Sequence, residues 1–87
     1  MRRISRVEYM SHRPTRGPVM APAMEKAWFA DDKGRIGTVF MDVTDKDWNF
    51  VVLAPDAEGE YRWVAGNGGM DPQEEAEQAL TAEMLRM

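Results

Sequence analysis

The chain has 87 residues and a mass of 9.9 kDa, which is enough for one small domain and too little for two independent cores. Its formal net charge is −4, and it contains no cysteine, which excludes disulfides, thiolate nucleophiles and cysteine-based zinc sites. No apolar run reaches the roughly 18 residues that a membrane-spanning helix needs, so we predict no membrane partner.

The first part of the chain is basic and rich in proline. Residues 1–17 carry five arginines and one glutamate, a net charge of +4, whereas residues 18–87 carry six basic and fourteen acidic residues, a net charge of −8. Three prolines interrupt any helix or central strand, so we predict a flexible basic tail over residues 1–24. The tail lacks the apolar stretch of a secretory signal, and we therefore expect a cytoplasmic protein.

The following residues alternate between strand-forming segments and short polar turns. Each turn has four or five residues, a length that suits hairpins and cannot carry a parallel crossover. The sequence therefore predicts an antiparallel meander of three to four strands. The predicted strands are residues 28–29, 35–43, 48–54 and 60–65, with turns at residues 31–34, 44–47 and 55–59.

A glycine-rich break at residues 66–69 precedes a predicted C-terminal helix. Asp71 is the expected N-cap, and Glu74 stands where a capping box needs a carboxylate. Apolar residues recur at helical spacing after it, and such a stripe must be buried against the sheet. We predict that residues 25–87 form a single small acidic α+β domain, a meander with this helix packed on one face. Trp48 and Leu80 should be buried there, and the other face should stay uncovered and open to a homodimer.

The residues offer little chemistry for catalysis or for a metal. The single histidine, His12, lies in the tail, so the domain cannot assemble a Ser–His–Asp triad. Asp45, Asp47 and Asn49 have the alternate spacing that opens an EF-hand loop. Phe50 stands where that loop needs glycine, so the match fails. We predict no catalytic residues, no metal, no cofactor and no enzymatic activity.

Residues 49–80 also carry a family resemblance. They run from a strand through Pro55-Asp56 and Gly59, then through a glycine-containing loop into the helix sequence Asp-Pro-Gln-Glu-Glu-Ala. This order resembles part of the HicB-type antitoxins. The resemblance implies a small α+β domain that pairs with a toxin protein and often with DNA, and it assigns no site residue.

The acidic excess of the domain predicts a mode of action. Carboxylates on turns and on an exposed helix face attract basic protein surfaces over long range. We therefore predict a non-enzymatic protein–protein interaction protein, of the antitoxin-like or phage-inhibitor kind, that binds a basic partner. The expected partner-binding residues are Asp45, Asp47, Glu74, Glu75 and Glu77.

The basic tail supports an alternative function. An arginine-rich arm can neutralise phosphates, so the protein could be a small nucleic-acid-binding module whose sheet only anchors the arm. The residues that would bind nucleic acid are Arg2, Arg3, Arg6, Arg13 and Arg16.

Overall fold

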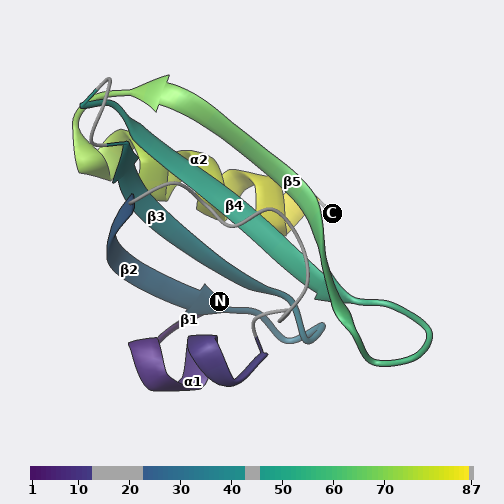
Figure 1. Cartoon of the computed structure of the whole chain (residues 1–87). Helices are drawn as coiled ribbons and strands as arrows, with labels where there is room; N and C mark the ends of the chain where they lie inside the picture. Colours follow the sequence, from purple (N-terminus) through teal and green to yellow (C-terminus); the bar gives the residue numbers. More distant parts are fainter. Residues whose placement is uncertain (13–22, 43–45, 87) are drawn as a thin grey trace.

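A computed structural model of the chain describes residues 1–12, 23–42 and 46–86. The described strands pair antiparallel in the order β1-β2-β3-β4-β5 (Figure 1). The predicted α+β meander with a C-terminal helix on one face is confirmed, with five strands in place of three to four. The elements are β1 (Arg2–Ile4), α1 (Arg6–His12), β2 (Ala23–Ala30), β3 (Ile36–Asp42), β4 (Trp48–Pro55), β5 (Tyr61–Met70) and α2 (Gln73–Arg86).

Two of the hairpins close with the same kind of turn. The backbone N–H of Asp31 and that of Asp56 each donate to the carbonyl oxygen four residues later, at 3.0 and 2.8 Å. The fourth residue of each turn, Gly34 or Gly59, has a φ of 80° or 84°. Only glycine adopts this conformation without a steric penalty, which explains why the turns at residues 31–34 and 55–59 could be predicted.

Strand β5 continues through the predicted break at residues 66–69 and ends at Met70. Two of its glycines lie beneath side chains of the sheet. A Cβ on Gly66 would lie 2.8 Å from the Nε1 atom of Trp63, and a Cβ on Gly68 would clash with the Oδ1 atom of Asn49. These glycines therefore make room for neighbouring side chains in the sheet and do not end the strand.

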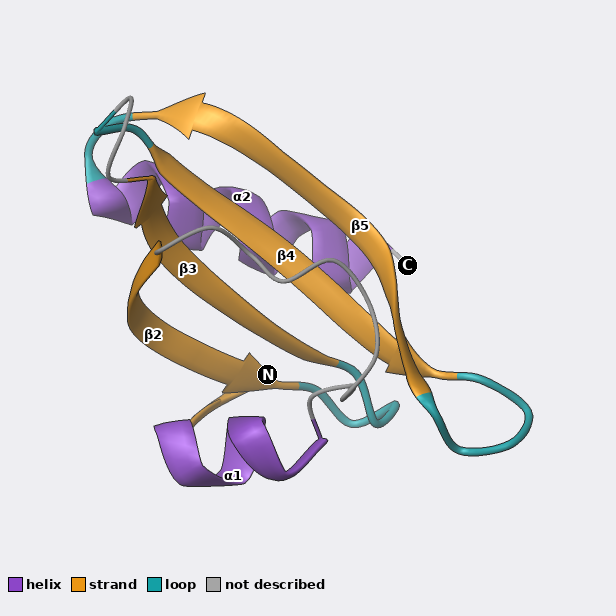
Figure 2. Cartoon of the chain, in the orientation of Figure 1, coloured by secondary structure: helices purple, strands orange, loops and turns teal. Residues whose placement is uncertain are grey.

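The larger core lies between the sheet and α2, which runs along one face of the strands (Figure 2). Leu80 is fully buried in it, and Trp48 is partly buried against it, so the predicted helix face is confirmed. The helix approaches β3 closely at Gly37, where a Cβ would lie 2.7 Å from the Cδ1 atom of Leu80. The buried residues of this core are Ala27, Phe29, Val39, Phe50, Val52, Met70, Ala76, Leu80 and Met84.

A second, smaller core occupies the opposite face of the sheet. Ile4 from β1 and Tyr9 from α1 pack there with Ala30, Ile36 and Leu53 from the central strands. Thr38 and Val51 are buried as well. The expectation of an uncovered second face is therefore wrong for the part of the sheet that α1 covers through Tyr9. The part over β5 stays open, since Trp63 lies opposite Leu53 and is 64% exposed, so a homodimer through this face stays a prediction.

The predicted tail without structure is likewise wrong for residues 2–12, which form β1 and α1. Ser5 caps α1, because its Oγ atom accepts a hydrogen bond from the backbone N–H of Glu8 at 3.1 Å. Strand β2 begins at Ala23, so the expected boundary after residue 24 falls inside a strand. Residues 13–22 of the predicted tail lie outside the described residues.

Candidate functional site

Acidic residues from two distant parts of the sequence meet at one end of the sheet. Trp48, the first residue of β4, pairs with Met70, the last residue of β5, so the segments before β4 and after β5 are neighbours. Figure 1 shows α2 beginning at this same end. We call the four acidic residues gathered there the acidic end: Asp47, Asp71, Glu74 and Glu75.

The carboxylates of the acidic end lie at the surface, where Lys46 is the neighbour of Asp47 in the chain. Asp71, Glu74 and Glu75 are exposed, and Asp47 is partly buried. The ion pairs of Arg2, Arg35, Arg62 and Arg86 go to other carboxylates. With Lys46 included, this end keeps an excess of negative charge.

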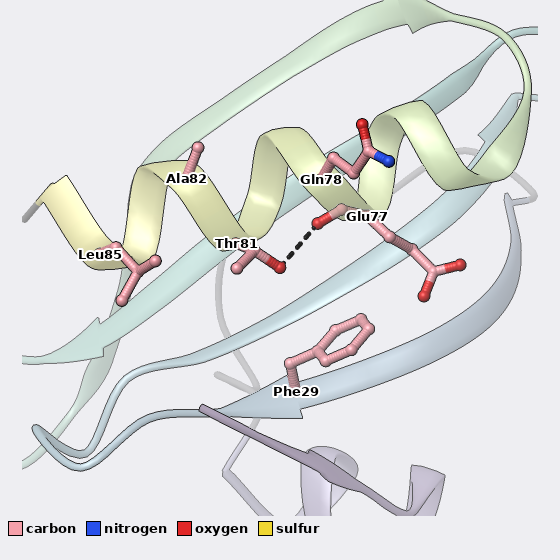
Figure 3. Close-up of a pocket in the computed structure, with 6 residues that line it drawn as sticks. All are labelled: Phe29, Glu77, Gln78, Thr81, Ala82 and Leu85. Atoms are coloured by element: carbon pink, nitrogen blue, oxygen red, sulfur yellow. Dashed lines mark hydrogen bonds between the residues drawn. The ribbon is translucent and has the colours of Figure 1, made fainter.

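The predicted site residues do not all belong to this end. The backbone N–H of Asp71 donates to Oε2 of Glu75 at 3.3 Å. Glu75, and not the predicted Glu74, is therefore the carboxylate that accepts the hydrogen bond from the backbone of Asp71. Glu77 accepts from Nε2 of Gln73 at 3.1 Å, and its carboxylate points toward β2 (Figure 3). Asp45 lies outside the described residues.

A shallow groove of about 350 Å³ runs between α2 and the neighbouring strand β2. Figure 3 shows the ring of Phe29 rising from β2 toward the helix, with Glu77 beside it. The hydroxyl of Thr81 donates to the backbone oxygen of Glu77 at 2.9 Å, so the helix carries this side chain in a fixed position. Sequence reasoning missed the groove, because only the pairing of the elements brings its walls together. Its lining residues are Phe29, Glu77, Gln78, Thr81, Ala82 and Leu85.

The arginines of the alternative function are partly engaged within the chain. Arg2 forms an ion pair with Glu8 at 3.2 Å. The guanidinium of Arg3 lies over the ring of Phe29, 5.7 Å from its centroid, as in a cation–π contact. Arg6 is exposed at the start of α1. The other two predicted positions, Arg13 and Arg16, lie outside the described residues.

Sequence reasoning also missed a buried ion pair in the turn between β2 and β3. Nε of Arg35 donates to Oδ2 of Asp31 at 2.5 Å, and the two side chains are only 8% and 10% exposed. The Nη2 atom of Arg35 donates to the backbone oxygen of Met84 at 2.5 Å. The pair thus ties this turn to the last turn of α2, where a cation is favourable to the helix dipole. Its role is structural, since every described partner of the pair belongs to the fold.

The hydrogen bonds around Asp31 change its pKa. Burial of the carboxyl raises this pKa. Hydrogen bonds from the backbone and guanidinium of Arg35 and from the backbone of Lys33 lower it by more than burial raises it, so the pKa lies below the usual 3.8. Unfolding returns the carboxyl to its usual pKa, so the unfolded chain binds a proton at a pH where the folded chain does not. The stability that Asp31 contributes is therefore complete above about pH 5 and is lost as the pH falls through the folded pKa.

We accordingly expect the free energy of unfolding to decrease below about pH 4, measured by urea denaturation between about pH 7 and pH 2. Asp31→Asn should remove part of this decrease, because asparagine does not titrate. Part of the slope should remain, since the pKa of Asp56 is also lowered, mainly by the bond from Arg62. An unchanged pH dependence in the Asp31→Asn variant would contradict this assignment.

Among the described residues, no group of three or more histidine and acidic side chains is arranged to hold a metal ion. No described helix is long and apolar enough to cross a membrane. Comparison with known proteins finds no match, whether to a family model, to a curated protein or to a solved structure. The resemblance to HicB-type antitoxins therefore stays a prediction, and the function has to be argued from the surface of the molecule.

Proposed function

We propose that the protein is a non-enzymatic interaction protein that binds a basic surface of a partner protein with its acidic end, in the cytoplasm and in the manner of an inhibitor. One observation carries the proposal. Asp47 precedes β4, whereas Asp71, Glu74 and Glu75 surround the start of α2, and the sheet register brings the four to one end, where they outnumber the cation of Lys46. Four acidic residues from two parts of the sequence thus share one end of the sheet.

A group of charges of one sign mainly affects the rate at which two proteins associate. A patch of one sign steers an oppositely charged surface toward it and raises the association rate, and salt weakens this effect. Exposed carboxylates need little desolvation before they meet a partner. The acidic end would also suit a partner whose basic surface ordinarily holds nucleic acid, because carboxylates can take the place of phosphates there.

The nucleic-acid alternative has less support from the described residues. Arg2 is paired with Glu8, and Arg3 lies on Phe29, so both cations have partners within the fold. A bound phosphate would have to compete with these contacts. The acidic body would also repel the nucleic acid at low salt.

A pair of matched variants tests the proposal. Asp71→Asn with Glu74→Lys changes the charge of the acidic end and leaves the bond of Glu75 to the backbone intact. Glu58→Lys with Glu60→Gln makes the same change of charge in the exposed turn between β4 and β5, at the other end of the sheet (Figure 1). We expect the first variant to lower the association rate with a captured partner by about tenfold or more at low salt, and the second to leave it nearly unchanged.

The partner is captured at low salt on the immobilised protein, identified by mass spectrometry and purified, and its kinetics are measured by surface plasmon resonance. The difference between the variants should shrink at high salt. Equal association rates for both variants would overturn the proposal. Strong, salt-dependent binding of labelled DNA, lost when Arg2, Arg3 and Arg6 become alanine, would favour the alternative instead.

A further inference from the structure

The outer face of α2 has a stripe of uncharged side chains beside the groove, two of them apolar. Gln78, Ala82 and Leu85 are exposed and Thr81 is half-buried, and their spacing places all four on one side of the helix. Leu85 is 75% exposed at the end of this row. Phe29 lies at the floor of the groove next to this stripe (Figure 3).

We propose that the stripe is a self-association surface, on which α2 of a second copy packs antiparallel to form a two-fold homodimer. The order of side chains along the helix supports this occupant. If the two-fold axis passes between Thr81 and Ala82, each small residue faces a small residue, so the helices can approach closely. Leu85 of each copy then lies opposite Gln78 of the other, at the groove of that copy. An isologous contact forms each of these pairs twice.

The charges along α2 favour the antiparallel arrangement. The first turn carries Glu74 and Glu75, and the last turn carries Arg86. Glu75 and Arg86 are eleven residues apart, about three helical turns, and so lie on the same flank of the helix. In an antiparallel two-fold pair, the same flanks of the two helices meet, which brings Arg86 of one copy to Glu75 of the other. In a parallel two-fold pair the opposite flanks of the two helices meet, and Glu75 and Arg86 lie at different heights, so this contact would be lost.

Arg86 is able to make this second contact. Its side chain is 73% exposed, and both of its bonds to Glu83 use the Nη2 atom. The guanidinium has further N–H donors on Nε and Nη1. Glu75 is shared with the acidic end, but Asp71 and Glu74 are not needed in this contact. The variant with Asp71→Asn and Glu74→Lys therefore tests the proposed partner without removing the dimer contact, and either proposal can fail alone.

The absence of cysteine from the chain permits a direct test of the geometry. In the proposed dimer the two copies of Ala82 face each other on one flank, within the separation of about 4.4 to 6.8 Å between Cα atoms that a disulfide requires. We expect Ala82→Cys to form a disulfide-linked dimer under mild oxidation, seen on a non-reducing gel. Ala57→Cys, in the exposed turn between β4 and β5, is the control and should stay monomeric on the gel.

Sedimentation equilibrium on the full chain tests the contacts themselves. We expect a reversible dimer for the unmodified protein, and a dissociation constant raised at least about tenfold by Leu85→Asp. Val7→Asp places the same charge at a side chain that is 80% exposed on α1 and should have no effect. Glu75→Arg and Arg86→Glu should each weaken the dimer, and the double variant should restore it.

Circular dichroism confirms that each variant is folded before it is compared. The proposal is overturned if the unmodified protein stays monomeric at high concentration, which would leave the stripe to a different partner. It is equally overturned if Leu85→Asp leaves a dimer intact, or if Ala57→Cys crosslinks as readily as Ala82→Cys.

Discussion

Asp31→Asn should destabilise the protein by about 3 to 5 kcal/mol, because it leaves the buried guanidinium of Arg35 without its counter-charge. The amide oxygen of asparagine can still accept the backbone bonds from Lys33 and Arg35, so the turn itself keeps its hydrogen bonds. The decrease in the free energy of unfolding therefore measures the contribution of the ion pair and not that of the turn. Urea denaturation at neutral pH measures it.

The turn between β4 and β5 provides a matched control. Oδ1 of Asp56 accepts from the backbone of Glu58 and Glu60, and Oδ2 accepts from Nε of Arg62 at 2.7 Å. The chemistry is the same, but Arg62 is exposed, so water can solvate its charge once the pair is lost. Asp56→Asn should therefore cost much less than Asp31→Asn. Equal losses in the two variants would show that burial of the first pair has no energetic importance.

Leu80→Ala should destabilise the protein by about 2 to 5 kcal/mol. Leu80 is fully buried, and its Cδ1 atom lies against β3 at Gly37, where no side chain can move in to fill the space. The substitution therefore removes apolar contacts and leaves a cavity. For a domain of this size the loss is a large part of the total stability.

Leu85→Ala makes the same chemical change in the same helix at an exposed position. It should alter the free energy of unfolding by no more than about 0.5 kcal/mol when both proteins are unfolded at a concentration where they sediment as monomers. A loss below this limit for Leu80→Ala as well would mean that α2 does not pack on the sheet through Leu80.

Local patterns in the sequence were sufficient for much of the fold. The alternation over residues 48–54, the glycines of two turns and the apolar stripe after Asp71 each depend on neighbours in the chain. The prediction for the start of the chain is wrong although a local signal is present, since Ser5 and Glu8 have the spacing of a capping box. The predicted strand over residues 60–65 is shorter than β5, because the glycines at residues 66–69 favour a break, and only the paired strand shows what lies over them.

The candidate site was predictable only in part. The exposed carboxylates Glu74 and Glu75 follow from the helical pattern alone. Their meeting with Asp47 depends on the pairing of Trp48 with Met70, and register is a tertiary property. The ion pair joins Asp31, in the predicted turn at residues 31–34, to Arg35, the first residue of the predicted strand, and nothing local indicates that α2 would bury it.

The hydrogen bond from Arg35 to Met84 also affects the order in which parts of the protein can fold during synthesis. Its two residues are separated by 49 positions. A ribosome releases the strands of the meander first, so the hairpins can pair while α2 is still being made. Until residue 84 has emerged, the guanidinium lacks one of its acceptors and the apolar face of the sheet lacks its cover. The core between the sheet and α2 can therefore be completed only after residue 84 has been made.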